Sequence, residues 1–404
     1  MGSRISGLPA ILVATGIAGI AAYVVTWWVP QVIGPVDYAV FAVFWSALYL
    51  VVGALAGIQQ EVTRATRPRV ADDSSASIRN FAVGGAVLVL IAVLASAPLW
   101  VDQVFPELGW SLVVPLAFGT ASYVLVAVLC GSLYGMQAWG SLALLLSLDA
   151  LLRLAAVVVT LVFTTDIPTI AWAASAPFLV TLIVLWPRVR RDIVGKSATD
   201  VRYRALTWNV SRTLLASAAA AALVSGLPLI LSLTSSDAPP ALLATLFLTV
   251  ALTRAPLIVT IMALQGYLIV RFRDAGESFW RVFLTFIGVI LGGAVVLAAL
   301  GWWLGPAVYG FLFPQNIVLD GGFFAILVGS SALVGALSVS ASAALARSQH
   351  FAFSAGWVAA AAVTIAALLL PLGLIERTAI ALLVGPLAGL AVHLVALLRG
   401  RSAR

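Results

Sequence analysis

Twelve apolar runs, each long enough to cross a lipid bilayer, follow one another along the chain. A transmembrane helix needs about 20 consecutive apolar residues, and no soluble core could bury so many such runs. They cover residues 8–29, 39–60, 79–100, 111–136, 139–163, 167–187, 208–233, 240–270, 280–304, 322–346, 352–375 and 378–398. Because a helix satisfies its own backbone polar groups in lipid, we predict an all-α polytopic membrane protein with about 12 transmembrane helices in two six-helix bundles.

The composition agrees with this class and argues against others. Of the 404 residues, 63% are hydrophobic and only 9% are charged. The single Cys130 lies in an apolar run, and the two histidines lack the spacing of a metal site. We find no phosphate-binding glycine loop, nucleophile elbow or HExxH motif. We therefore predict a transporter without metal or cofactor rather than an enzyme.

The charges are distributed unevenly between alternate loops. With a cytoplasmic N-terminus, the inner segments hold all of the 22 Lys and Arg residues except Arg153, Arg254 and Arg377. The outer loops carry the acidic residues Asp37, Asp102, Glu107, Asp166, Asp237, Asp320 and Glu376. This is the positive-inside pattern. It predicts a multi-pass protein of the plasma (inner) membrane with both termini in the cytoplasm, and it explains the net charge of +7 without nucleic-acid binding.

The longest polar segment, residues 188–207, lies between the sixth and seventh runs. It predicts an N-terminal lobe over 1–187, a cytoplasmic linker over 188–207, a C-terminal lobe over 208–398 and a basic cytoplasmic tail over 399–404. Two joined bundles suit alternating access, in which one half rocks against the other around a central site.

Glycine pairs one helical turn apart predict close helix packing. We interpret four pairs in this way: Gly53 and Gly57, Gly131 and Gly135, Gly288 and Gly292, Gly385 and Gly389.

Charged residues inside the apolar runs mark the predicted binding site. Arg254, followed by Pro256, lies near the middle of the run 240–270, where an arginine costs about 2.5 to 3.5 kcal/mol. Asp149 and Arg153 share one helix face at i and i+4. Two deep arginines against one carboxylate favour an anion, and guanidinium groups bind phosphate oxygens bidentately.

Each of these deep groups has a second interpretation. The pair of Asp149 and Arg153 either is a structural ion pair or lines a cavity where Arg153 exchanges Asp149 for a substrate phosphate. Arg254 either binds phosphate, or caps carbonyls freed by Pro256, or extends to a membrane interface.

Polar residues near the cytoplasmic helix ends extend the predicted site. Arg64 and Arg212 are either members of a cationic vestibule or ordinary positive-inside residues, and Glu61 is a candidate partner for Arg254. Four amides either hydrogen-bond sugar hydroxyls or lie at the interface: Gln59, Gln60, Asn209 and Gln265.

Two stretches carry a resemblance to a known family. The first is Val32 to Phe41, which contains Gly34-Pro35-Val36-Asp37-Tyr38, and the second is Gly57 to Arg64. They resemble the N-terminal region of actinobacterial polysaccharide biosynthesis proteins in the multidrug/oligosaccharidyl-lipid/polysaccharide flippase superfamily. The run from Thr253 to Pro256 also looks like the proline-broken part of helix eight in such flippases.

The resemblance implies a flippase that turns a polyprenyl-(pyro)phosphate-linked glycan from the inner to the outer leaflet. In that case Arg254 would be a central phosphate ligand, with Arg64, Arg153 and Arg212 as vestibule residues. The implied partners are the lipid-linked anionic glycan, membrane lipids, and a polysaccharide polymerase or glycosyltransferases. Lipid II flippases of the superfamily carry two further C-terminal helices, and twelve helices favour export of another lipid-linked sugar.

Two other functions stay open. A cation-coupled multidrug exporter shares the plan but needs deep carboxylates that change charge, and only Asp149 qualifies. A silent scaffold for a cell-wall synthase complex is the third reading. Proton coupling and sodium coupling are both open for either transporter.

Overall fold

The computed structural model describes residues 7–68, 76–199, 203–235, 237–347 and 349–402. Within these ranges the side chains of residues 7, 8, 67, 68, 76, 77, 199, 203–205, 209, 212, 254–267, 270 and 400–402 lie outside the description. The chain forms two compact units, Met1–Ala221 and Ala222–Arg404, called unit 1 and unit 2 below.

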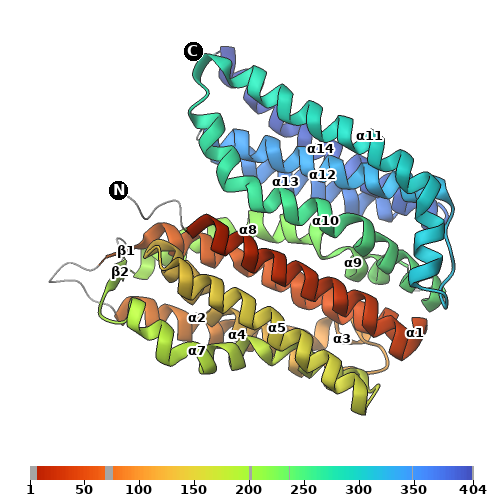
Figure 1. The fold of residues 1–404 in the computed structure, drawn as a ribbon, viewed down its shortest axis with the longest axis horizontal. Helices are drawn as coiled ribbons and strands as arrows, with labels where there is room; N and C mark the ends of the chain where they lie inside the picture. The colour runs from red at the N-terminus through yellow and green to blue at the C-terminus, as the bar shows by residue number, and fades with distance from the viewer. Residues whose placement is uncertain (1–6, 69–75, 200–202, 236, 348, 403–404) are drawn as a thin grey trace. The chain divides into compact units, whose positions relative to one another are not determined.

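Both units are built from helices (Figure 1). Unit 1 contains α1 (Gly7–Ala65), β1 (Thr66–Pro68), α2 (Ala76–Ser96), η1 (Ala97–Leu99), α3 (Val101–Val104), α4 (Trp110–Gly135), α5 (Trp139–Phe163), α6 (Ile167–Ser175), α7 (Pro177–Ile193), β2 (Ser197–Thr199) and most of α8 (Tyr203–Val224). Unit 2 contains α9 (Leu227–Thr234), α10 (Pro240–Arg273), η2 (Gly276–Ser278), α11 (Phe279–Leu312), α12 (Gly321–Ala346), α13 (His350–Leu368) and α14 (Leu374–Ser402).

The helices confirm the predicted class of an all-α, multi-pass membrane protein. Among the described residues, nine helices are long and apolar enough to span a membrane, or ten if α8 and α9 form one bent span. The first of the nine, α1, contains the first two predicted segments. The remaining predicted segment, 240–270, lies in α10, whose side chains are described only in part.

The predicted loop between the first two segments is wrong. The helix of α1 continues through Pro30, and only Gly34 leaves helical geometry, with φ 78° and ψ 170°. Glycine adopts such a positive φ without steric cost. Pro35 then starts the second half with a φ that suits the first helical position, and Asp37 follows in its first turn. The Gly-Pro motif therefore makes a bend of one residue rather than a loop.

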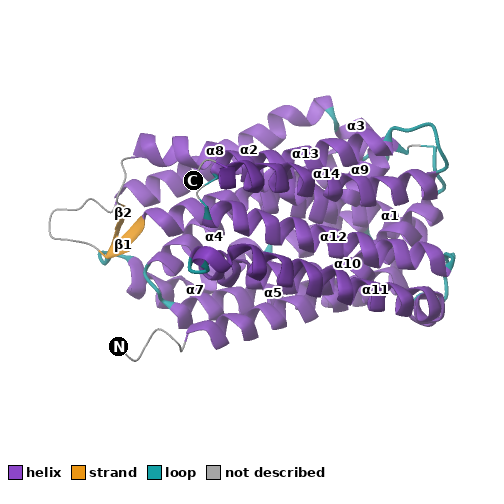
Figure 2. Ribbon diagram, turned by 90° about the horizontal axis from the view of Figure 1, so that it is seen from above, coloured by secondary structure: helices purple, strands orange, loops and turns teal. Residues whose placement is uncertain are grey.

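A short ribbon of two strands was not predicted. β1 pairs antiparallel with β2, with Thr66 opposite Thr199 and Pro68 opposite Ser197, and the ribbon lies at one end of the helices (Figure 2). It joins the segment after α1 to the segment after α7, so these two segments lie at the same end of unit 1. Both were predicted to be cytoplasmic, and the ribbon is consistent with that topology.

The predicted linker 188–207 contains regular structure. Helix α7 continues to Ile193, β2 follows, and α8 begins at Tyr203. The division between the units falls later, within α8, because the first part of α8 packs on α1. Thr213 of α8 donates a hydrogen bond to the Gly57 carbonyl, 3.3 Å away. A separate cytoplasmic linker stays a prediction.

The two units repeat one packing scheme. In unit 1, α4 packs against α1, α2, α5, α6 and α7, and in unit 2, α12 packs against α10, α11, α13 and α14. These are the fourth and tenth of the predicted segments. Five buried serines of α12 bond to carbonyls of their own helix, which allows a polar helix to lie centrally: Ser330, Ser331, Ser338, Ser340 and Ser342.

Three of the four glycine pairs pack closely on another helix, as predicted. Cβ atoms at Gly53 and Gly57 would meet α8, one at Gly131 would meet α1, one at Gly135 would meet Thr66 of β1 and Thr63 of α1, and those at Gly385 and Gly389 would meet α13. The pair Gly288 and Gly292 is the exception, because a Cβ atom at either position would meet no atom of another helix within 4 Å. They lie on exposed positions of α11, so the prediction is wrong for this pair within the described chain.

We expect Gly131→Ala to destabilise the protein by about 1 to 3 kcal/mol, because overpacking a close contact strains the core. The added Cβ would lie 2.8 Å from the Gln59 carbonyl oxygen, which belongs to the backbone and cannot rotate away. Thermal unfolding in detergent measures the effect. Gly288→Ala is the matched control and should not lower stability. Equal unfolding midpoints for the two variants would contradict the packing role.

Candidate functional site

Asp149 and Arg153 of α5 form an ion pair in the interior of unit 1. The Nη2 atom of Arg153 lies 2.7 Å from Oδ2 of Asp149, and the two side chains are 5% and 20% exposed. Nη1 of Arg153 donates to the Ala174 carbonyl. The guanidinium carbon also lies 3.9 Å from the ring centroid of Phe178, a cation–π contact. Arg153 therefore has a partner on three sides.

The break between α6 and α7 explains why an arginine is needed there. Helix α6 ends at Ser175, and α7 begins at Pro177. The last carbonyls of a helix have no donor within that helix, and Pro177 has no backbone N–H to offer. Arg153 supplies a donor to one of them, the Ala174 carbonyl. A buried carbonyl without a donor would cost free energy, so this contact stabilises the break.

Two tyrosines from other helices surround the pair. Tyr49 of α1 lies beside both Asp149 and Arg153, and Tyr123 of α4 packs on Phe178 with ring centroids 5.2 Å apart. Sequence reasoning missed both tyrosines, because a tyrosine in an apolar run has no distinctive spacing. The pair and its neighbours thus connect α1, α4, α5, α6 and α7.

This geometry fits the structural interpretation of the pair. Binding a phosphate at Arg153 would mean breaking contacts to Asp149 or to the Ala174 carbonyl. The Oδ1 atom of Asp149 is buried and has no hydrogen-bond partner among the described residues, so the carboxylate keeps one acceptor for a group that approaches it. Roles of Arg153 and Asp149 in substrate binding stay predictions.

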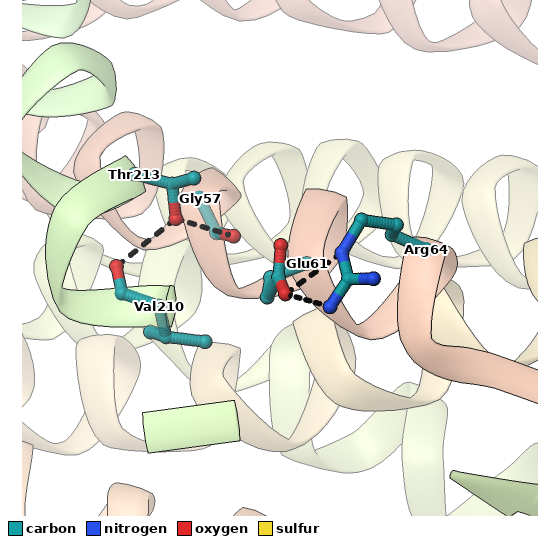
Figure 3. Close-up of polar contacts among 5 residues, drawn as sticks. All are labelled: Gly57, Glu61, Arg64, Val210 and Thr213. Carbon is teal, nitrogen blue, oxygen red and sulfur yellow. Dashed lines mark hydrogen bonds and ion pairs between the residues drawn. The ribbon is translucent and has the colours of Figure 1, made fainter. Parts of the chain in front are cut away.

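Glu61 and Arg64 form a second pair near the end of α1 (Figure 3). Nε of Arg64 donates to Oε1 of Glu61 at 2.9 Å, and the Glu61 side chain is 8% exposed whereas that of Arg64 is 50% exposed. Glu61, predicted as a partner for Arg254, is thus held by Arg64. Gln60 is exposed and Gln59 is partly buried.

Helix α8 approaches the same part of α1. The hydroxyl of Thr213 lies 3.3 Å from the Gly57 carbonyl and 3.0 Å from the Val210 carbonyl (Figure 3). Glu61 is one turn of helix after Gly57. The structure therefore brings α8 next to the predicted vestibule residues of α1, which sequence spacing alone could not indicate.

Four predicted site residues lie outside the described side chains: Asn209, Arg212, Arg254 and Gln265. The backbone at 209 and 212 belongs to α8, and that at 254 and 265 belongs to α10. Helix α10 does not end at position 256. The roles of these four residues stay predictions.

We expect Arg153→Met to lower stability by about 3 to 5 kcal/mol, because it leaves the Asp149 carboxylate buried without its partner. Asp149→Leu combined with Arg153→Met should recover part of this loss, since the pair is then replaced by apolar groups. The Ala174 carbonyl still lacks its donor in the double variant, so recovery stays incomplete. Thermal unfolding of the three proteins measures this, and a double variant less stable than Arg153→Met would contradict the analysis.

Comparison with known sequences gives relatives that span nearly the whole chain. No protein-family model matches. The uncharacterized protein Rv3630 of Mycobacterium tuberculosis strain H37Rv is 34% identical over 392 residues, which cover 96% of this chain and 90% of the relative. The uncharacterized protein Rv1510 of the same strain is 33% identical with the same coverage.

Comparison with solved structures gives the fold. The inward-facing conformation of a multidrug resistance MATE family transporter of the MOP superfamily has a TM-score of 0.67 and 16% identity, covering 96% of this chain and 94% of that chain. Its outward-facing conformation has a TM-score of 0.65 and 16% identity, covering 98% and 96%. The protein has the fold of the MATE transporters, and by sequence the chain belongs to the family of these mycobacterial proteins.

Proposed function

We propose that the protein is an alternating-access transporter that flips a polyprenyl-(pyro)phosphate-linked glycan from the inner to the outer leaflet of the plasma membrane. The fold supports transport, because the two similar solved structures are an inward-facing and an outward-facing conformation of one kind of transporter. A protein with two such states can present a site to either side in turn. The proposed activity is therefore transport and not catalysis.

One observation favours an anionic substrate over a cationic one. Asp149 and Glu61 are each held by an arginine of the same helix. An exporter that exchanges a cationic drug for protons or sodium ions needs a deep carboxylate that can change its charge or partner. The arginine beside each carboxylate balances its charge, so neither is well suited to bind a cation.

In the proposed cycle the phosphate groups of the substrate enter from the side of the membrane on which the arginine-rich inner segments are predicted to lie. Arg254 is the central phosphate ligand, and Arg64 and Arg212 guide the anion on the way. Arg153 joins them only by exchanging Asp149 for a phosphate. Amides at Gln60, Asn209 and Gln265 hydrogen-bond the sugar. In this proposal the arginine-rich segments face the cytoplasm. The acidic loops lie on the opposite side of the membrane, where the glycan is released. A polymerase or glycosyltransferase on the outer side would consume it.

A cation-coupled multidrug exporter is the second candidate. The solved structures that share the fold are described as multidrug resistance transporters, which is the observation in its favour. The two candidates differ in the charge of the transported molecule, so one experiment separates them.

We expect Arg254→Ala to reduce flipping of a polyprenyl-pyrophosphate-linked glycan at least about tenfold, since losing one side of a buried charge pair costs 2 kcal/mol or more. Purified protein is reconstituted into vesicles, and the reagent-accessible fraction of the glycan headgroup is followed with time. Arg281→Ala is the matched control, because Arg281 is an exposed arginine of α11 in the same unit.

Efflux of a fluorescent cationic dye is measured in the same vesicles. Flipping of the anionic lipid by the wild type and by Arg281→Ala, without dye efflux, supports the flippase. Dye efflux that Asp149→Asn abolishes, with no movement of any anionic lipid, identifies the exporter instead. Equal rates of glycan flipping for all the variants would show that Arg254 is not part of the binding site.

A further inference from the structure

His393 lies in the interior of unit 2, where three helices meet. It belongs to α14, and it is 0% exposed. Its Nδ1 atom lies 2.8 Å from the hydroxyl oxygen of Ser340 in α12. Its Nε2 atom lies 3.2 Å from the Phe353 carbonyl oxygen of α13. Both ring nitrogens therefore have a polar partner, each from a different helix.

The space for this imidazole depends on a glycine. A Cβ atom at Gly356 of α13 would overlap the Nε2, Cδ2 and Cε1 atoms of His393. A Cβ atom at Gly389, one turn before His393 in α14, would lie 2.5 Å from the Gly356 carbonyl oxygen. The backbones of α13 and α14 thus approach closely around the ring, and the ring has little freedom to move.

The hydrogen bonds of Ser340 allow two arrangements of protons. The Phe353 carbonyl can only accept, so Nε2 carries a hydrogen. The Ser340 hydroxyl has a single hydrogen and two acceptors, Nδ1 of His393 and the Leu337 carbonyl, both 2.8 Å away. If the hydroxyl donates to Nδ1, the imidazole is neutral. If the hydroxyl donates to the Leu337 carbonyl, its oxygen can accept from Nδ1–H, and the imidazole is an imidazolium ion.

We propose that His393 and Ser340 form a proton-binding site through which unit 2 responds to pH and transport is coupled to protons. The step adds one proton from solvent to Nδ1, and the Ser340 hydroxyl turns from Nδ1 to the Leu337 carbonyl. The reverse step returns that proton. Neither state leaves a buried donor or acceptor of these three groups unpaired, so the usual penalty for an unpaired buried group is avoided in both.

No carboxylate forms a described contact with this ring. Helix α12 has no charged residue between Gly321 and Ala346, and in α13 the only titratable group is the exposed His350. The other charged residues of α14 are Glu376, Arg377, Arg399 and Arg401. Arg347, after α12, donates to the Leu397 carbonyl, one turn beyond His393. The proton would therefore add a buried positive charge that has no counter-charge among the described residues, which costs free energy. The balance between the neutral and the protonated ring then depends on how the surrounding helices pack.

The ring lies within two helical turns of Arg399 in α14. His393 precedes Arg399 by six residues, about 9 Å along a helix. Gln349, in the turn between α12 and α13, donates to the Ala396 carbonyl at 3.2 Å, and its own Oε1 atom is buried without a partner among the described residues. A polar side chain with a vacant acceptor thus lies against α14 between His393 and Arg399 in sequence.

Histidine NMR tests the site directly. The chain has two histidines, so protein labelled with 15N-histidine and reconstituted in liposomes gives two sets of ring signals. His350→Asn leaves those of His393. We expect Nε2–H with an unprotonated Nδ1 at pH 8, and protonation of Nδ1 as the pH is lowered to 5. A ring that stays neutral over this range, or the Nδ1–H tautomer at pH 8, would overturn the proposal.

Ser340→Ala tests the role of the hydroxyl. It removes the acceptor for Nδ1–H, so protonation of the ring should require a pH lower by about one unit or more. Ser342→Ala is the matched control, because Ser342 is a buried serine of the same helix whose hydroxyl bonds to the Ser338 carbonyl. Identical titration of the two variants would show that Ser340 does not support the protonated ring.

Coupling is tested in the vesicle assay, and this part rests on the proposed function. Transport by the wild type should change with an imposed pH gradient, and transport by His393→Gln should lose that dependence. The same dependence in both proteins would overturn the coupling. If the ring titrates as expected and dye is transported in place of a lipid-linked glycan, the flippase proposal fails while the proton-binding site stands.

Discussion

Carbonyl groups at the ends of helices are the constraint on which much of this structure depends. A carbonyl at a helix end has no backbone donor, and within a membrane no water replaces it, at a cost of several kcal/mol. Arginines meet this need at two places. Arg153 donates to the Ala174 carbonyl of α6, and Arg377 donates to the carbonyl of Leu368, the last residue of α13. Arg377, the one basic residue predicted outside, thus has a structural reason for its position.

Apolar length and charge allowed the fold to be predicted, because the bilayer restricts what a long apolar run can do. Details that depend on backbone geometry or on distant residues were not predictable. The bend at Gly34 follows from one pair of dihedral angles. The pairing of Thr66 with Thr199 joins residues far apart in sequence, and the environment of a glycine pair such as Gly288 and Gly292 depends on which helices pack nearby.

The candidate site was also predictable from the sequence only in part. The i, i+4 spacing predicted the contact of Asp149 with Arg153, because residues one turn apart on a helix are neighbours. It could not indicate that Arg153 also reaches the Ala174 carbonyl on another helix. His393 is one of the two histidines that lack the spacing of a metal site. Its position in an apolar run was nevertheless a signal, because an ionisable residue within a membrane is costly and usually functional.

The last two predicted segments of each unit are joined by different kinds of side chain. In unit 1, the fifth and sixth segments are joined by Arg153, which remains charged at any physiological pH. In unit 2, helices α13 and α14, which are the eleventh and twelfth predicted segments of the chain, meet at His393. Histidine is the side chain best suited to change its charge near neutral pH. A lobe held by an arginine keeps its internal contacts as pH changes. A lobe held by a histidine and a serine hydroxyl can exchange one hydrogen-bond arrangement for another, which is why we propose unit 2 as the part of the described fold that responds to protons.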